Sequence, residues 1–168
     1  YLALRDPDGT WHRPTSLDDP LSHPGALARC PQAAFAPDGT LVVTWFETRG
    51  DATAVLAWRG RTRDDAALPQ ELSTPGRDAV QPSLVVPPDG GALVVYAEGE
   101  GNHDTWQIVA RRHQPHTDTW LPAEPLSDTF TGLAPAPALA LAPADGRVLA
   151  AWPQGGVLDG RVHVATLP

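Results

Sequence analysis

The sequence predicts an all-β protein, a β-propeller of four-stranded antiparallel blades with about three blades in its 168 residues. Three observations predict it: the abundance of helix breakers, a hairpin pattern that recurs at a regular interval, and short hydrophobic runs that are apolar on both sides. Nineteen Pro and fifteen Gly residues are too many for a helical bundle. A hydrophobic content of 42% still supplies material for a core.

The repeated unit consists of two apolar runs joined by a Pro/Asp-Gly turn, with an aromatic residue at the end of the second run. It occurs at residues 31–45, 82–96 and 137–152. In each unit the Asp-Gly pair can supply the positive φ that a tight hairpin turn requires. We therefore expect equivalent, buried positions in successive blades for the three terminal aromatic residues, Trp45, Tyr96 and Trp152.

A third apolar run follows each pair, and a fourth, weaker element closes two of the units. The third runs lie at 54–58, 106–110 and 162–165. The fourth elements end near Leu72 and Leu126, about 54 residues apart, and a similar element precedes Leu17. A four-strand unit at this period is typical of a propeller blade. A β-sandwich is the alternative, but it has no reason to repeat its turn chemistry at a fixed interval.

The runs divide the chain into a half blade at 1–18, full blades at 28–73 and 79–127, and a three-stranded partial blade at 134–168. Propellers usually have 4–8 blades, so the ring is predicted to be incomplete. An open arc would leave apolar blade faces uncovered. We expect another protein chain, a second copy of this chain or further blades of a longer chain to complete the propeller.

The hairpins and the segment Asp6-Pro-Asp-Gly-Thr-Trp11 resemble the repeats of sialidase-like propellers, whose Asp-box turn reads Ser-x-Asp-x-Gly-x-Thr-Trp. The segment lacks the leading Ser, and its Asp–Gly spacing is one residue short. The resemblance implies a propeller fold more than an activity. A sialidase-like site would combine clustered Arg, a Tyr–Glu pair and an Asp, but the family's Arg-Ile-Pro motif is absent and packing accounts for Tyr96.

A binding site is expected on the face that carries the loops between second and third strands and between blades. These loops differ among the repeats, whereas the Asp-Gly turns on the opposite face stay alike. The loop face is acidic, which favours a cationic protein surface or a metal-bridged sugar over the carboxylate of a sialic acid. The candidate ligand-binding residues are Glu47, Arg49, Asp51, Asp78, Glu98, Glu100, Asn102, Asp104 and Asp159.

Two patterns could bind a metal ion. Glu98, Glu100, Asn102 and Asp104 place oxygen ligands at every second position of a Gly-containing loop, which makes them a candidate calcium site. The alternative is a solvated acidic loop. A second pattern, His113 and His116 beside Asp118, lacks a third zinc ligand, so we expect exposed turn histidines there.

The sequence favours a non-catalytic propeller module that binds a protein or a glycan and needs no cofactor. No nucleophile elbow, phosphate loop or dinucleotide fingerprint occurs. The alternative is a fragment of a sialidase-like glycoside hydrolase. A net charge of −8 argues against a nucleic-acid partner, and no apolar run is long enough to span a membrane. The absence of Met and the family resemblance predict an extracytoplasmic protein, secreted or periplasmic.

Overall fold

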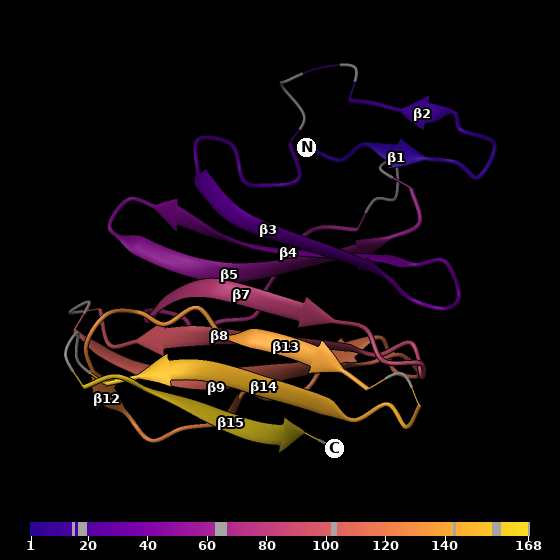
Figure 1. Cartoon of the computed structure of the whole chain (residues 1–168). Helices are drawn as coiled ribbons and strands as arrows, with labels where there is room; N and C mark the ends of the chain where they lie inside the picture. The colour runs from indigo at the N-terminus through magenta and orange to yellow at the C-terminus, as the bar shows by residue number, and fades with distance from the viewer. Residues whose placement is uncertain are drawn as a thin grey trace.

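The computed structural model describes residues 1–14, 16, 20–62, 67–101, 104–142, 144–155 and 159–167. Every regular element within these ranges is a β-strand (Figure 1). This part of the chain contains no candidate for a membrane-spanning helix. The strands are β1 (Leu4–Arg5), β2 (Trp11–His12), β3 (Leu27–Phe35), β4 (Leu41–Arg49), β5 (Ala52–Gly60), β6 (Gln70–Glu71), β7 (Asp78–Val85), β8 (Ala92–Gly99), β9 (Thr105–Gln114), β10 (Thr119–Trp120), β11 (Glu124–Pro125), β12 (Phe130–Thr131), β13 (Ala138–Leu141), β14 (Val148–Gln154) and β15 (Arg161–Leu167).

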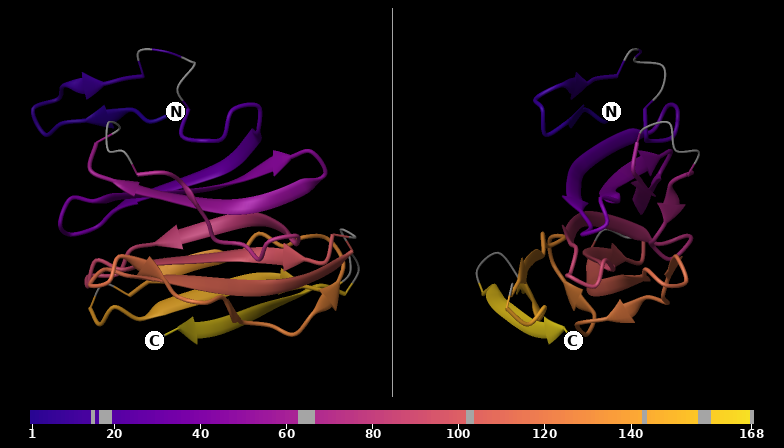
Figure 2. Two further views of the ribbon diagram at one scale, coloured as in Figure 1. Left: turned by 180° about the vertical axis from the view of Figure 1, so that it is seen from behind. Right: turned by 90° about the vertical axis from the view of Figure 1, so that its right-hand side faces the viewer.

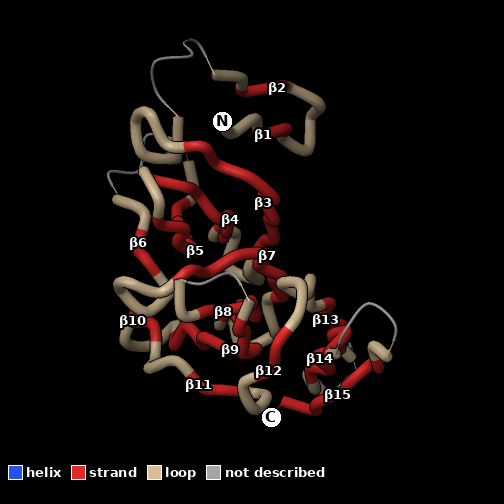
Figure 3. The backbone as a smooth tube through the Cα atoms, turned by 90° about the vertical axis from the view of Figure 1, so that its left-hand side faces the viewer, coloured by secondary structure: helices blue, strands red, loops and turns tan. Residues whose placement is uncertain are grey.

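Strands that follow one another in sequence pair antiparallel and form separate sheets. β1 pairs with β2, β3 to β6 form the next sheet in order, and β13 to β15 form the last. In the sheet between them, β7 to β10 pair in order and β9 also pairs with β11 and β12. Figures 2 and 3 show the sheets following an arc, with the N-terminal hairpin at one end and the β13–β15 sheet at the other. The predicted fold, a partial propeller of antiparallel sheets, is confirmed.

The Asp-Gly turns share one local structure. In the turn between β3 and β4, the Asp38 carboxylate accepts a hydrogen bond from the Thr40 backbone N at 2.9 Å. The bonds from Thr40 hold the pKa of Asp38 below its ordinary value. Equivalent bonds to the Asp side chain close the other turns, and each Gly has a positive φ that residues with a Cβ rarely adopt. These glycines are Gly9, Gly39, Gly90 and Gly146.

The core lies between the sheets rather than inside any one of them. Leu56 and Trp58 of β5 face the N-terminal hairpin, where Leu2 and Leu4 pack against them. The opposite face of the same sheet packs against β8 and β9, and the far face of β8 and β9 packs against β14. β8 is buried along its whole length. The sheets therefore stabilise one another by covering apolar faces on both sides.

The repeated aromatic residues hold equivalent places in these interfaces. Each lies in the second strand of its sheet and faces the preceding sheet, with exposed fractions of 4% for Trp45, 0% for Tyr96 and 4% for Trp152. The Tyr96 hydroxyl donates a hydrogen bond to the Leu72 carbonyl at 2.9 Å, and burial raises the pKa of Tyr96. The prediction of equivalent, buried aromatic positions is confirmed.

Two of the innermost strands carry a β-bulge that the sequence patterns did not reveal. Pairing shifts between Arg29 and Gln32 in β3 and between Val80 and Ser83 in β7. At each bulge a residue that is not Gly has a positive φ, 51° at Cys30 and 58° at Gln81. The Cys30 thiol donates to the Gln81 side-chain oxygen at 3.6 Å, so the two bulges meet.

The outer strands are short, and the sequence underestimated their number. β9 is ten residues long, which allows the segment after it to pair with it at β10, β11 and β12. β12 lies in a stretch expected to be an inter-blade loop. The two predicted fourth elements, which end near Leu72 and Leu126, make the same contact with the third strand of their sheets. The Ser73 hydroxyl accepts a hydrogen bond from the Val55 backbone N, and the Ser127 hydroxyl accepts one from the Ile108 backbone N.

Replacing Trp45 with Ala should lower the free energy of unfolding by about 3–5 kcal/mol, because it opens a cavity between two sheets. Chemical denaturation followed by far-UV circular dichroism measures the loss. The matched control is Trp11→Ala, since Trp11 is 52% exposed and its removal should change stability by less than about 1 kcal/mol. Equal losses in both variants would contradict the assigned packing.

Candidate functional site

Glu98, predicted as a ligand, lies at the end of β8 and points into the protein with an exposed fraction of 3%. Its carboxylate accepts hydrogen bonds from the Thr74 backbone N at 2.7 Å and from the Thr74 hydroxyl at 3.1 Å. The Arg77 guanidinium lies 3.6 Å away and balances the charge. Glu98 therefore fixes the loop that leads into β7.

Glu47 has the same role one sheet earlier. It is fully buried at the end of β4 and accepts from the His23 backbone N at 3.3 Å and from the Trp45 indole N at 3.0 Å. The His23 ring N lies 2.6 Å from its other oxygen, and Arg49 forms an ion pair with it at 3.2 Å. In β14 the equivalent position is Gln154, whose side-chain oxygen accepts from the indole N of the neighbouring Trp at 3.2 Å.

Asp78 connects two sheets. It is 4% exposed at the start of β7 and accepts from the Thr53 backbone N at 3.1 Å and from the Thr53 hydroxyl at 2.9 Å. Thr53 belongs to β5 of the preceding sheet. The sequence had suggested an exposed acidic surface that includes Glu47, Asp78 and Glu98. In the structure these three side chains are buried instead. Buried carboxylates need partners, and the loops supply them.

The remaining candidates among the described residues are exposed, and two of them take part in ion pairs around the buried carboxylates. Arg49 extends from the Glu47 ion pair to a second one with Glu71 at 3.0 Å. Glu100 pairs with Arg77 at 3.2 Å. Three more candidates are exposed on the loop face, namely Asp51, Asp104 and Asp159.

The calcium prediction finds no geometric support in the described residues. Their His, Cys, Asp and Glu side chains form no group of three or more that could hold a metal ion. The physical reason is that the Glu98 carboxylate turns inward toward Thr74, away from the exposed Glu100. Asn102, the fourth predicted ligand, lies outside the described residues.

Asp159 lines an open groove on the loop face, between the β7–β12 sheet and the β13–β15 sheet. The groove has a volume of about 590 Å³. One wall is β12 with its neighbours, and the other is the end of β14 and the start of β15. The exposed His163 ring stacks on the buried Trp152 ring with a centroid distance of 6.2 Å. The lining residues are Thr105, Thr129, Phe130, Thr131, Gln154, Gly155, Asp159, Arg161 and His163.

Sequence reasoning found one residue of this groove and missed the rest. Asp159 was predicted as a ligand. Phe130 lies between the blades predicted at 79–127 and 134–168, in a loop expected on the same face, but it was not among the candidate residues. The missed signal is the pattern Thr129-Phe130-Thr131, in which polar residues flank an aromatic one beside a loop. Arg161 and His163 alternate with Val162 and Val164 at the start of their strand, which also marks a polar position at a sheet end.

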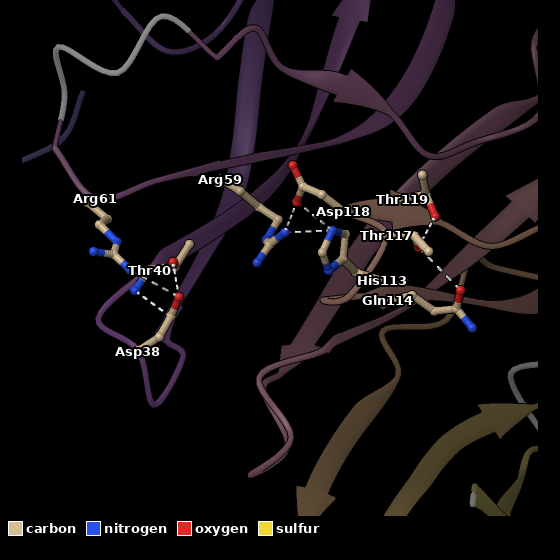
Figure 4. Close-up of polar contacts among 9 residues, drawn as sticks. All are labelled: Asp38, Thr40, Arg59, Arg61, His113, Gln114, Thr117, Asp118 and Thr119. Atoms are coloured by element: carbon tan, nitrogen blue, oxygen red, sulfur yellow. Dashed lines mark hydrogen bonds and ion pairs between the residues drawn. The ribbon is translucent and has the colours of Figure 1, made fainter.

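The opposite face carries a buried histidine that was predicted to be exposed. His113 is 2% exposed near the end of β9, and its Nε2 lies within hydrogen-bonding distance of Arg59 from the preceding sheet and of Asp118 (Figure 4). Arg59 and Asp118 also form an ion pair. The ring packs edge-on against Trp120 at 5.3 Å. His116 is exposed, so the two histidines do not converge on a metal.

Beside this cluster is a groove of about 540 Å³ that separates the Asp38 and Asp89 turns. Its charged side chains are engaged with one another, Arg59 with Asp118 and Arg61 with Asp38. The groove on the loop face contains an aromatic side chain, several polar groups and a residue predicted from the sequence. It is the stronger candidate site.

Comparison with known proteins adds information on the fold alone. No protein-family model matches the chain, and no curated protein matches it in sequence. Among solved structures, an α-L-arabinanase of Penicillium chrysogenum complexed with arabinobiose matches with a TM-score of 0.52 and 17% identity, over 76% of this chain and 41% of that one. This structure is a propeller, and at 17% identity the likeness concerns architecture only.

Two further matches have lower TM-scores. A thermostable family-43 glycoside hydrolase gives 0.47 at 12% identity, over 83% of this chain and 50% of that one. An endo-arabinase of Bacteroides thetaiotaomicron gives 0.46 at 13% identity, over 81% and 54%. This chain spans about half the length of the structures it matches. The match to the arabinanase supports the propeller fold, and none of the comparisons supports membership of the sialidase family.

Replacing Glu98 with Ala should lower the free energy of unfolding by about 3 kcal/mol, because Arg77 and the Thr74 N–H lose a buried charged partner. Urea denaturation measures the difference. Glu100→Ala is the control, because Glu100 is exposed and should contribute less than about 0.5 kcal/mol. A loss in the control as large as that of E98A would show that burial does not distinguish the two carboxylates.

Stability should fall as the pH drops below about 6.5, the ordinary pKa of histidine. Burial, reinforced by the Arg59 charge, lowers the pKa of His113 in the folded protein. Below pH 6.5 the unfolded chain therefore binds a proton that the folded chain does not. This proton uptake lowers the free energy of unfolding. His113→Gln should flatten the stability profile between pH 7 and pH 5, whereas His116→Gln should leave its slope unchanged. An unaltered slope in H113Q would contradict the assignment.

Proposed function

We propose that this chain is the ligand-binding part of a larger β-propeller and that it binds a glycan in the groove between β12 and the start of β15, without cleaving it. The composition of the groove carries the proposal. Sugars present apolar C–H faces and many hydroxyl groups, so they suit a cleft with an aromatic side chain and a few polar donors and acceptors. Phe130 supplies an aromatic ring in this groove, and Asp159, Arg161 and His163 supply hydrogen-bonding groups.

The arrangement of carboxylates supports binding without hydrolysis. Glycosidases generally use two carboxyl groups, about 5–5.5 Å apart in retaining and about 6.5–9.5 Å apart in inverting enzymes. Among the described residues that line the groove, Asp159 alone carries a carboxylate. The buried Glu47, Asp78 and Glu98 already accept hydrogen bonds from loops and are unsuited to proton transfer with a substrate.

A second function, part of a glycoside hydrolase, is favoured by the likeness to the arabinanase, whose structure holds arabinobiose. In that case the remaining carboxylates would come from blades that complete the ring. The glycan would then be an arabinose oligomer, and the groove would bind part of it. The extracytoplasmic location stays a prediction under both proposals.

Isothermal titration with arabinobiose and a panel of other oligosaccharides tests the first proposal. We expect saturable binding of at least one glycan, and a roughly 10- to 100-fold loss of affinity in Asp159→Ala, the effect of removing one charged hydrogen-bond partner. Asp51→Ala, a change at an exposed carboxylate outside the groove, should bind as the wild type does.

Two results would contradict the proposal. Unchanged binding in D159A would place the ligand elsewhere. Release of reducing sugar by the purified chain, lost in D159A, would establish the hydrolase instead of the binding module.

A further inference from the structure

A further pocket lies on the face of the Asp-Gly turns, between the β7–β12 sheet and the β13–β15 sheet. Its volume is about 500 Å³, a size typical of small-ligand sites, and the functions proposed above do not use it. Three buried residues form its apolar part, Ala92 and Leu93 of β8 and Val148 of β14. β8 and β14 each pair with a strand on both sides, so the pocket lies between the interiors of two sheets.

The Asp carboxylates of two other turns on this face are fully engaged. In the turn between β3 and β4, Asp38 accepts a hydrogen bond from the Thr40 hydroxyl at 2.9 Å and pairs with Arg61 at 3.3 Å (Figure 4). In the turn between β13 and β14, Asp145 pairs with the Arg147 guanidinium at 2.6 Å. In both turns the residue after the Gly supplies a side chain that contacts the second carboxylate oxygen.

The turn between β7 and β8 lacks this side chain. Gly91 occupies the place that Thr40 and Arg147 hold in the other turns, and only its backbone N donates to Asp89, at 2.9 Å. Within the described part of the chain, the exposed Asp89 carboxylate has no other hydrogen-bond or ion-pair partner. A Cβ at position 91 would lie 2.9 Å from the His113 carbonyl oxygen, so a larger residue does not fit there.

Asp89 borders the pocket together with two other charged residues, Asp145 and Arg112. Asp145 is paired with Arg147, and Arg112 makes an interaction of its own within the protein. Among the described residues of the lining, Asp89 is therefore the charge without a counter-ion. Beside an apolar surface, such a carboxylate favours a cation that brings its own apolar part.

His113 of β9 also lines the pocket, with an exposed fraction of 2%. Its Nε2 faces Arg59 and Asp118, whereas its other ring nitrogen, Nδ1, has no hydrogen-bond partner in the described part of the protein (Figure 4). Buried polar atoms are normally paired with protein groups, water or a ligand. Besides Asp89, the lining thus contains a second polar group whose hydrogen bonding is incomplete.

We propose that this pocket binds a primary ammonium group on an aliphatic stem, with the ammonium at Asp89 and the stem against Leu93 and Val148. An ammonium has three N–H donors, which suit the open oxygen of the carboxylate. The methylene groups of the stem gain free energy when they leave water for the apolar part of the pocket. A lysine side chain of another protein and a free diamine both present this chemistry. The site is on the face opposite the glycan groove, and the proposal is independent of the glycan proposal.

A nuclear magnetic resonance titration of the ¹⁵N-labelled chain with N-acetyl-lysine N-methylamide tests the proposal. We expect saturable shifts centred on the Gly90 and Gly91 amides, with a dissociation constant in the millimolar range. Asp89→Asn keeps an oxygen that accepts from Gly91 and removes the charge, so it should raise this constant at least about 5-fold. Asp38→Asn, the same change in a turn outside the pocket, is the matched control and should leave it unchanged.

Two further probes separate charge from stem and one source from the other. N-acetyl-norleucine N-methylamide has a similar stem without the charge and should bind at least about 5-fold more weakly than the lysine derivative. Tighter binding of the lysine derivative than of 1,5-diaminopentane assigns the site to a protein side chain, and the reverse order assigns it to a free diamine.

Three results would each overturn the proposal. The first is equal binding of the norleucine and lysine derivatives, because the charge would then contribute nothing. The second is an unchanged dissociation constant in D89N. The third is the absence of saturable shifts near Gly91 in the wild-type chain with every ammonium probe.

Discussion

The strands in the middle of this chain are apolar on both faces, and this constraint shapes the rest of the structure. A sheet such as β3–β6 or β7–β12 cannot be stable with one face in water, because each face exposes several aliphatic side chains. Stacking successive sheets solves the problem for both neighbours at once. The arc and the interfaces with their aromatic residues follow from this one requirement.

Stacking leaves polar backbone groups without partners at the ends of the strands, where a loop joins each sheet to the next. The loops at these joints carry backbone N–H groups that β-pairing leaves unpaired. Glu47 and Glu98 satisfy them from positions two residues beyond the repeated aromatic residue, and Gln154 stands at the same position in β14. The acidic character of the chain is thus partly structural, and part of its negative charge is buried at the joints rather than displayed.

The fold could be predicted from the sequence because turn chemistry is local: Asp-Gly pairs and the aromatic residues that follow them identify each hairpin without knowledge of its neighbours. The site could not be predicted from the sequence, because the direction of a side chain at a strand end depends on the adjoining loop. Glu98, spaced like a calcium ligand, turns inward to Thr74. His113 looked like a turn residue, yet β9 extends far enough to bury it against Arg59. The bulges at Cys30 and Gln81 were marked only by the Pro that follows each of them.

Burial differs along the chain, so its backbone amides differ in how well they are protected from hydrogen exchange. β8 is covered on both faces by other sheets, whereas β1, β2 and β15 lie at the ends of the stack with much of their surface in solvent. Local opening costs least where few contacts must break. Amide hydrogens should therefore exchange slowest in β8 and progressively faster toward both termini. Proteases that require an unfolded segment would find their first cleavage sites at the two ends, leaving the middle sheets as a resistant fragment.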